Sequence, residues 1–241
     1  MRRSIVATVL AAAAVSACGR THSENGGPAV SRSYQVGGFD KIEVAGPYDV
    51  QVRTGANPSV SASGPQKMIE RMTVEVRDGK LLIRPEREHG WFQMGWNSHG
   101  NVQLTVTVPQ LHGAAITGSG DIKVDQARGD SFEGVVTGSG GLDVAALDVQ
   151  TLKLSIAGSG GVKTGSGKAQ SANFDIAGSG DIDAKGVQVQ TADVSIAGSG
   201  SIATQAIRTA AVSIMGSGDV QVTGGAKCTI TKAGSGDVSC S

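Results

Sequence analysis

The chain has 241 residues, of which 21 are basic and 21 acidic, so its formal charge is zero at neutral pH. This balance argues against a nucleic-acid-binding surface, which needs an excess of Lys and Arg on one face. Glycine accounts for 36 residues and aromatic residues for only 3% of the chain. The composition therefore predicts a core of small and β-branched side chains rather than of large rings.

Residues 1–18 have the features of a targeting segment. Arg2 and Arg3 give it a positive start, an apolar run follows, and the segment ends in Val-Ser-Ala-Cys at Cys18. The last four residues look like a lipobox, the signal after which a bacterial lipoprotein is cleaved and its cysteine lipidated. The sequence predicts a lipoprotein signal peptide with lipidation at Cys18, and Gly19 after the cysteine favours the outer membrane.

Two other interpretations of this segment remain open, namely an ordinary secretory signal cleaved near the same place and a short anchor helix. A membrane-spanning helix needs about 20 apolar residues, and this run is shorter. The lipoprotein interpretation is therefore preferred. Residues 19–33 are polar and carry no apolar pattern, which predicts a flexible tether between the lipid and a folded domain.

The first part of that domain, residues 34–112, contains segments in which apolar and polar residues alternate as in strands. These segments are residues 41–44, 49–53, 59–62, 72–77, 80–84 and 102–108. The dipeptide Asp78-Gly79 favours a tight hairpin between two of them. We expect irregular coils here that also close the N-terminal end of the domain, because an uncapped end would expose strand edges and apolar surface.

A candidate binding loop lies between two of these strands, at residues 85–100. It contains His89, Trp91, Phe92, Trp96 and His99. Aromatic side chains on a loop can anchor a glycan, a membrane surface or a protein partner. The alternative is that Trp91 and Phe92 fold back onto the domain and fill a gap in it, since exposed tryptophans are costly unless they are used.

The tripeptide Gly-Ser-Gly recurs along the rest of the chain. It begins at Gly118, Gly138, Gly158, Gly178, Gly198, Gly216 and Gly234, in steps of 20, 20, 20, 20, 18 and 18 residues. Apolar residues alternate with polar or small ones on both sides of it, which is strand periodicity. A period of about 20 predicts coils that stack on one another. Gly-Ser-Gly is the expected corner of each coil, because glycine tolerates backbone angles that other residues avoid.

These features predict an all-β fold, a parallel β-helix or solenoid with coils of about 20 residues and two or three short strands per coil. A solenoid grows by adding coils, so length alone does not require a second core. Residues 34–241 are therefore expected to form one β-helix domain. Its irregular N-terminal coils cover residues 34–112 and its regular coils cover residues 113–241.

The repeated Gly-Ser-Gly-Asp-Ile segments, preceded by strands such as Phe39–Val44 and Tyr48–Val52, resemble the bacterial DUF2807 family. This family is also described as the "putative auto-transporter adhesin, head GIN" domain. The resemblance covers the chain from about Tyr34 to the C-terminus. It implies a single-stranded right-handed β-helix on a secreted or envelope protein, with a role in adhesion.

Cys228 and Cys240 are predicted to form a disulfide. They remain once Cys18 is lipidated, in a compartment where disulfides persist. Cys228 stands six residues before the first glycine of the last corner and Cys240 stands six residues after it. Earlier coils carry Leu152 and Ala172 at the first position and Val124 and Val144 at the second, so both cysteines are expected to point inward in the last coil. The alternative is a pair of buried free thiols.

No motif predicts a metal, a cofactor or a catalytic group. The aspartates that follow four of the corners resemble calcium-binding repeats, but those repeats have a nine-residue period, and Gly or Ser replaces Asp in the other copies. We interpret the aspartates as turn residues that bond to nearby backbone. Thr164–Lys168 resembles a phosphate-binding loop but lacks its first glycine and its final Ser or Thr. Ser, His and Asp residues form no set with interpretable spacing.

Two functional hypotheses follow. The first is a non-enzymatic, lipid-anchored protein of the cell envelope, whose β-helix serves in binding, adhesion or scaffolding. Its partners are the membrane, through the lipid anchor, and a glycan or an envelope protein, while its oligomeric state is left open. The alternative is a carbohydrate-active enzyme, a polysaccharide lyase or hydrolase, because β-helices also carry such enzymes. A repetitive surface without an asymmetric catalytic cluster favours the first hypothesis.

Overall fold

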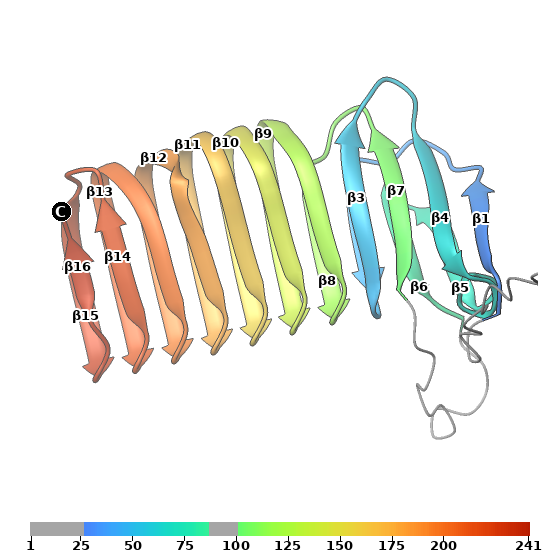
Figure 1. The fold of residues 1–241 in the computed structure, drawn as a ribbon. Helices are drawn as coiled ribbons and strands as arrows, with labels where there is room; N and C mark the ends of the chain where they lie inside the picture. Colours follow the sequence, from blue (N-terminus) through green and yellow to red (C-terminus); the bar gives the residue numbers. More distant parts are fainter. Residues whose placement is uncertain (1–26, 87–100) are drawn as a thin grey trace, which may run out of the picture.

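The computed structural model describes residues 27–86 and 101–241. The strands of these residues belong to one 16-stranded sheet, which winds into a parallel β-solenoid (Figure 1). The all-β class and the solenoid predicted from the repeat are thus confirmed.

The regular coils stack in register along the solenoid. They comprise β8 (Gly113–Gly118), β9 (Asp121–Gly138), β10 (Gly141–Gly158), β11 (Gly161–Gly178), β12 (Asp181–Gly198), β13 (Ser201–Gly216), β14 (Asp219–Thr223), β15 (Lys227–Gly234) and β16 (Val238–Cys240). Neighbouring coils pair in parallel, so that Ile122 aligns with Leu142, and Leu142 with Val162. Because parallel pairing repeats every coil, equivalent side chains form columns along the solenoid axis.

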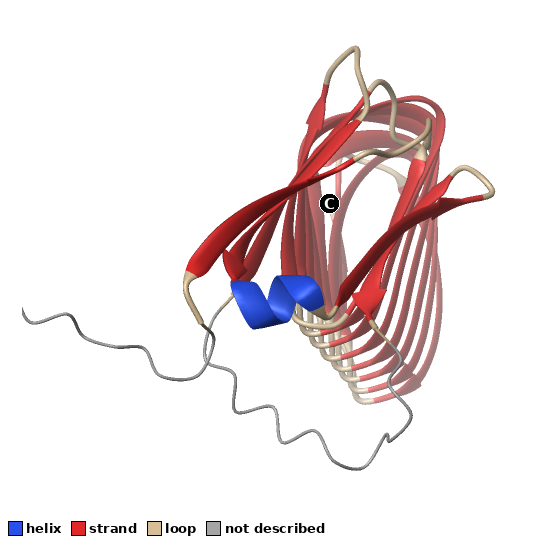
Figure 2. Ribbon diagram, turned by 90° about the vertical axis from the view of Figure 1, so that its right-hand side faces the viewer, coloured by secondary structure: helices blue, strands red, loops and turns tan. Residues whose placement is uncertain are grey.

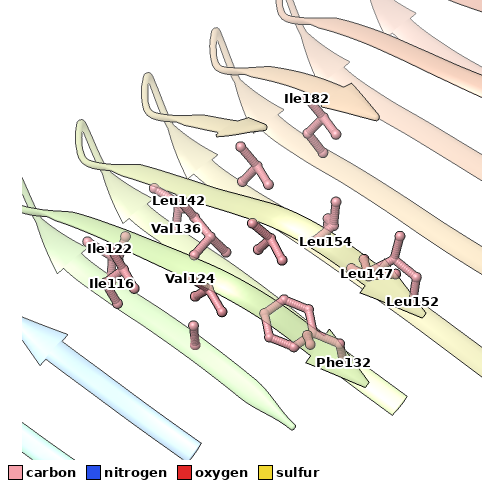
Figure 3. Packing of buried hydrophobic residues seen from close by; sticks show 14 of the residues in the cluster. Ile116, Ile122, Val124, Phe132, Val136, Leu142, Leu147, Leu152, Leu154 and Ile182 are labelled. Carbon is pink, nitrogen blue, oxygen red and sulfur yellow. The ribbon is translucent and has the colours of Figure 1, made fainter. Parts of the chain in front are cut away.

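Each long strand bends twice between two corners. In β9 the alternation of buried and exposed side chains changes phase at residues 125–126 and again at 130–131. In β10 the same changes occur at residues 145–146 and 150–151. A coil therefore has three straight segments, and its inward side chains fill the space that the segments enclose (Figure 3).

Large and small side chains are matched between neighbouring columns of the core. In β9 the large Phe132 is followed two residues later by Gly134, whereas in β11 the small Ala172 is followed two residues later by the large Phe174. Both phenylalanines are fully buried. A Cβ atom at Gly134 would lie 2.8 Å from Cδ2 of Leu154 on the next coil. The glycine thus leaves the volume that this leucine fills, as close packing requires.

The N-terminal coils are stacked in an order that differs from their order in the chain. β2 (Lys41–Ala45) and β3 (Tyr48–Thr54) form the coil that lies directly on the regular stack, where β2 pairs with β8 and β3 with β9. β6 (Lys80–Pro85) and β7 (Val102–Val108) form the next coil outward and pair with β2 and β3. The chain therefore builds an inner coil, then an outer one, and returns past both to start β8.

The N-terminal end of the solenoid is closed. β4 (Ser59–Pro65) and β1 (Ala29–Tyr34) extend one wall as antiparallel strands, and β5 (Met72–Arg77) extends the other as a hairpin with β6. The hairpin turn is Asp78-Gly79, with φ of 50° and 73°, as the sequence predicts. The helix α1 (Gln66–Glu70) lies across this end and buries Ile69 (Figure 2). The end thus carries, besides strands, a helix that the strand periodicity did not predict.

Candidate binding surface

The Gly-Ser-Gly corners form a continuous ridge in which the two glycines have different roles. The first glycine has a positive φ, for example 132° at Gly158, a conformation that side chains rarely adopt. The second has room only for a hydrogen atom, since a Cβ at Gly160 would lie 2.4 Å from the carbonyl oxygen of Gly140. From the second corner on, the serine N–H donates to the carbonyl oxygen of the first glycine of the preceding corner, as Ser159 does to Gly138 at 2.9 Å. The serine side chains are exposed.

The aspartates that follow the corners link consecutive coils. Oδ1 of Asp121 accepts a hydrogen bond from the N–H of Gly141 at 2.8 Å, and Oδ1 of Asp181 accepts one from the N–H of Ser201 at 3.1 Å. Asp219 does the same for the next coil at 3.0 Å. The aspartates thus bond to backbone, as interpreted from the sequence, but the bonded group belongs to the next coil rather than to the same turn.

A shallow depression of about 350 Å³ crosses the outer face of β9, β10, β11 and β12. Its floor is the backbone of Gly141 and Gly161, which replace the aspartate of the neighbouring coils. Asp121 and Asp181 border it at either end of this column. The depression therefore exists because two consecutive coils lack a side chain that the coils on both sides carry.

Charged side chains border the depression along the adjacent outward column. This column runs Lys123, Asp143, Lys163 and Asp183 in register. Lysine donates hydrogen bonds and ionised aspartate accepts them, so donors and acceptors alternate from coil to coil. Together with the two aspartates of the first column, two lysines and four aspartates surround the space, and acidic groups outnumber basic ones.

A second depression of about 240 Å³ lies on another segment of the coils, beyond the first bend. Glutamine amides dominate it, and Asp148 and Lys168 stand among them. The amides belong to Gln150, Gln170, Gln188 and Gln190. This region repeats the same chemistry with neutral donors and acceptors, on a smaller scale.

Of the residues predicted as sites from the sequence, the structure describes only Cys228 and Cys240, and neither lines these depressions. Cys18 and the candidate binding loop residues His89, Trp91, Phe92, Trp96 and His99 fall outside the described residues. The described chain stops at Glu86 and resumes at Asn101. In the neighbouring coil, Gly46-Pro47-Tyr48 takes the place of Gly-Ser-Gly, with Gly46 at φ of 118°. Tyr48 aligns with Val102, so β7 of the outer coil begins at the position that the second corner glycine has in the regular coils.

The sulfur atoms of Cys228 and Cys240 are bonded in the structure, with their Cα atoms 6.7 Å apart. Cys228 aligns with the buried Ala210 and Cys240 with the buried Val222, so both occupy inward columns. Cys240 is nevertheless exposed and Cys228 only half-buried, since among the described residues no strand pairs with the outer edge of β15 or β16. The expected inward positions are correct, but they do not bury the pair.

Two further properties of the described residues bear on the predictions. Within residues 27–86 and 101–241, no helix combines the length and the apolar character needed to cross a membrane. Over the same ranges, His, Cys, Asp and Glu side chains form no group that could hold a metal ion.

Sequence reasoning missed the depression although its signal was present. The loss of aspartate at Gly141 and Gly161 is visible in the repeat, but it was used only to argue against calcium. Reading it as a local loss of volume requires knowing that the position faces outward and that the two coils are adjacent. Once the register of the coils is known, glycines on two adjacent coils in an otherwise polar outward column predict a depression.

The stacked coils and their polar outer faces define a β-solenoid that presents a repetitive surface. The family model described as "Putative auto-transporter adhesin, head GIN domain" matches residues 38–226, and the chain belongs to this family. No curated protein matches the sequence.

Solved structures of bacterial proteins share the fold. A "putative adhesin" from Bacteroides fragilis has a TM-score of 0.78 at 22% identity and covers 88% of this chain and 97% of its own. A "putative lipid binding protein" from Parabacteroides distasonis has a TM-score of 0.68 at 22% identity, with coverage of 91% and 98%. A "putative adhesin" from Parabacteroides merdae has a TM-score of 0.70 at 18% identity, with coverage of 90% and 98%. At these identities the similarity shows the fold alone.

Proposed function

We propose that this protein is a non-enzymatic binding module of the cell envelope that holds a neutral, extended carbohydrate chain along its solenoid axis. The observation that carries the proposal is the depression over β9 to β12, where a glycine floor is bordered by alternating lysines and aspartates. The description of the family as an adhesin supports a binding role. So does the same word in the names of two structural relatives.

The spacing of the bordering groups favours a repeating ligand. Paired strands lie about 4.8 Å apart, so equivalent side chains recur at that interval along the axis. This interval is close to the length of one sugar unit in an extended polysaccharide. Sugar hydroxyls both donate and accept hydrogen bonds, which suits a column in which Lys123 donates and Asp143 accepts.

The charge of the depression favours a neutral ligand over an anionic one. Acidic groups outnumber basic ones around it, and like charges disfavour binding of a polyanion. The aspartates at its ends are also held in place. One oxygen of Asp121 is bonded to the N–H of Gly141, which fixes the carboxylate and leaves its second oxygen for a ligand. A preorganised group loses less conformational freedom on binding.

The alternative of a carbohydrate-active enzyme needs a pair of carboxyl groups with different roles. The carboxylates around the depression instead recur by column. Asp121 and Asp181 make equivalent hydrogen bonds to the next coil, and Asp143 and Asp183 occupy equivalent positions two coils apart. Repetition of this kind supports a binding surface rather than one catalytic centre.

The location of the protein is part of the proposal. The lipobox-like end of the targeting segment supports lipidation of Cys18, and Gly19 after it supports the outer membrane. The tether expected at residues 19–33 must be shorter than the sequence suggested, because β1 begins at Ala29 and pairs with β4. The residues between Cys18 and β1 would then link the domain to the membrane. The aromatic loop at residues 85–100 stays a prediction.

A glycan array probed with the full chain, followed by product analysis on every retained glycan, tests the proposal. We expect retention of one or more neutral polysaccharides without change to their length or linkages. Turnover of a glycan that a single point mutation abolishes would establish the enzyme instead. Retention of no glycan at all would contradict the carbohydrate ligand.

A further inference from the structure

The two ends of the solenoid are built differently. At the N-terminal end, α1 covers the core and Ile69 is 1% exposed. At the C-terminal end, among the described residues, β15 pairs only with β13 and β16 only with β14. No other strand of the described residues pairs with the outer edge of β15 or β16. Ile230, in an inward column, is 47% exposed. Such an edge is a template for adding another strand.

Lys232 changes the character of this edge. Two residues before each earlier corner, the inward column carries an aliphatic side chain. At the last corner this position is Lys232, which aligns with the buried Ile214 of the preceding coil. Its Nζ donates a hydrogen bond to the carbonyl oxygen of Gly236 at 2.7 Å. The ammonium group thus stays on the last coil, at the open end of the core.

A further coil placed on this end would have to bury the ammonium group. Between earlier coils, the same column stacks isoleucine on isoleucine, as Ile176 does on Ile196. Burying a charge without a charged partner is strongly unfavourable. A two-fold, end-to-end pair of solenoids would bury two such groups, one from each copy. Inward-pointing charge is one of the known means by which sheet proteins keep an edge strand unpaired.

We propose that Lys232 closes the C-terminal edge of the solenoid to strand addition by a second copy of this chain. The Cys228–Cys240 bridge holds the same coil together, since it joins the strand that carries Lys232 to β16. The edge is thus kept folded by the bridge and kept unpaired by the lysine. Removing the charge while keeping an apolar side chain makes the edge competent for end-to-end association.

The test is sedimentation velocity of the full chain in detergent, comparing the wild type with Lys232→Ile and Lys232→Met. Both variants replace the charge with an apolar side chain, β-branched in isoleucine and unbranched in methionine. If one variant folds poorly, the other still tests the proposal. We expect an association constant about tenfold or more above that of the wild type. Hydrogen exchange is measured on the same samples, because strand addition protects the amides of residues 227–234.

Two controls separate the charge from its surroundings. Ala233→Ile adds a larger apolar side chain to the neighbouring, exposed position of β15, and Lys232→Arg keeps the charge. Both should sediment like the wild type. The proposal is overturned if the uncharged variants sediment like the wild type, if Ala233→Ile associates equally strongly, or if association leaves exchange in residues 227–234 unchanged.

Discussion

At the scale of single residues, the glycines of this protein are not equivalent. Gly160 and Gly161 are neighbours in the chain, yet a Cβ at Gly160 would lie 2.4 Å from the Gly140 oxygen and 2.6 Å from Cγ1 of Val136. A Cβ at Gly161 would have the backbone carbonyl oxygen of Asp181 as its nearest atom, at 3.9 Å. One glycine is required by the stack, whereas the other only leaves space on the surface.

Alanine at the two positions should therefore have opposite effects. Gly160→Ala forces neighbouring coils apart and should lower the free energy of unfolding by about 2 kcal/mol or more. Gly161→Ala restricts the unfolded chain without a clash and should raise it by about 0.4 to 1 kcal/mol. Urea unfolding of the two variants beside the wild type measures this difference. Equal midpoints would mean that the stack does not constrain Gly160.

Tyr48 makes the stability sensitive to alkaline pH. It replaces the second glycine of a corner and is 3% exposed, and burial raises its pKa to about 12. The ordinary value is 10.0, so the unfolded state loses this proton first as pH rises. The stability that Tyr48 contributes is fully present below pH 10 and is lost between pH 10 and pH 12.

Unfolding free energies of the wild type and Tyr48→Phe, measured from pH 9 upward, check this. The wild type should lose stability above pH 10 more steeply than the variant. Tyr34 contributes in the same direction, because burial raises its pKa as well, so a smaller loss should remain in the variant. Parallel curves for the two proteins would contradict the role of Tyr48.

At the scale of elements, the period of Gly-Ser-Gly and the apolar positions around it were enough to predict the solenoid, its corners and its inward columns. The register confirms this for Ile156 on Ile176 and for the terminal pair Ala210 and Cys228. These features are predictable because each coil contacts only the neighbouring coils, so the local sequence pattern determines the local structure.

The order of the N-terminal coils could not be predicted in the same way. The coil of β2 and β3 pairs on one side with β6 and β7, and on the other with β8 and β9. Such pairings join residues far apart in the chain, and the alternating pattern of a strand does not identify the strand with which it pairs. The helix α1 is only five residues long, too short for helical periodicity to be visible in the sequence.

The last coil provides an element-scale prediction. A bridge that closes a loop as short as that from Cys228 to Cys240 should contribute roughly 2 to 3 kcal/mol in the chain-entropy model. Replacing both cysteines with serine should speed hydrogen exchange in β15 and β16 and leave β9 to β12 protected, because local opening follows local contacts.

The state of the thiols is measured directly on the same protein. Intact mass after alkylation, with and without prior reduction, counts the free thiols of protein purified from the envelope. We expect both cysteines to be alkylated only after reduction. Alkylation of both without reductant would rule the bridge out.

At the scale of the whole molecule, the solenoid is a rod with its N-terminal strands at one end and its C-terminus at the other (Figure 1). The depression lies between the ends, on four consecutive coils. A tether that leaves from the N-terminal end would leave this face and the C-terminal end accessible. The arrangement suits a module that is anchored at one end and binds along its side.

Lipidation at Cys18 is the whole-molecule prediction that this arrangement depends on. Metabolic labelling with a fatty-acid probe should mark the wild type in the outer-membrane fraction and should not mark Cys18→Ala. Equal labelling of the two proteins would show that Cys18 is not the lipidated residue.

If the ligand binds in the glycine-floored depression, one pair of substitutions should distinguish this site from the rest of its column. Gly161→Asp fills the depression with the residue that occupies this column at Asp181, at a position where a Cβ meets no atom closer than 3.9 Å. Ser201→Asp adds the same group and charge to the same column outside the depression.

Calorimetric titration with the glycan that the array selects gives the dissociation constants of both variants and the wild type. We expect Gly161→Asp to weaken binding by about tenfold or more, whereas the dissociation constant of Ser201→Asp should stay within about twofold of the wild type. Wild-type affinity in Gly161→Asp, or equal losses in the two variants, would contradict a binding site in the depression.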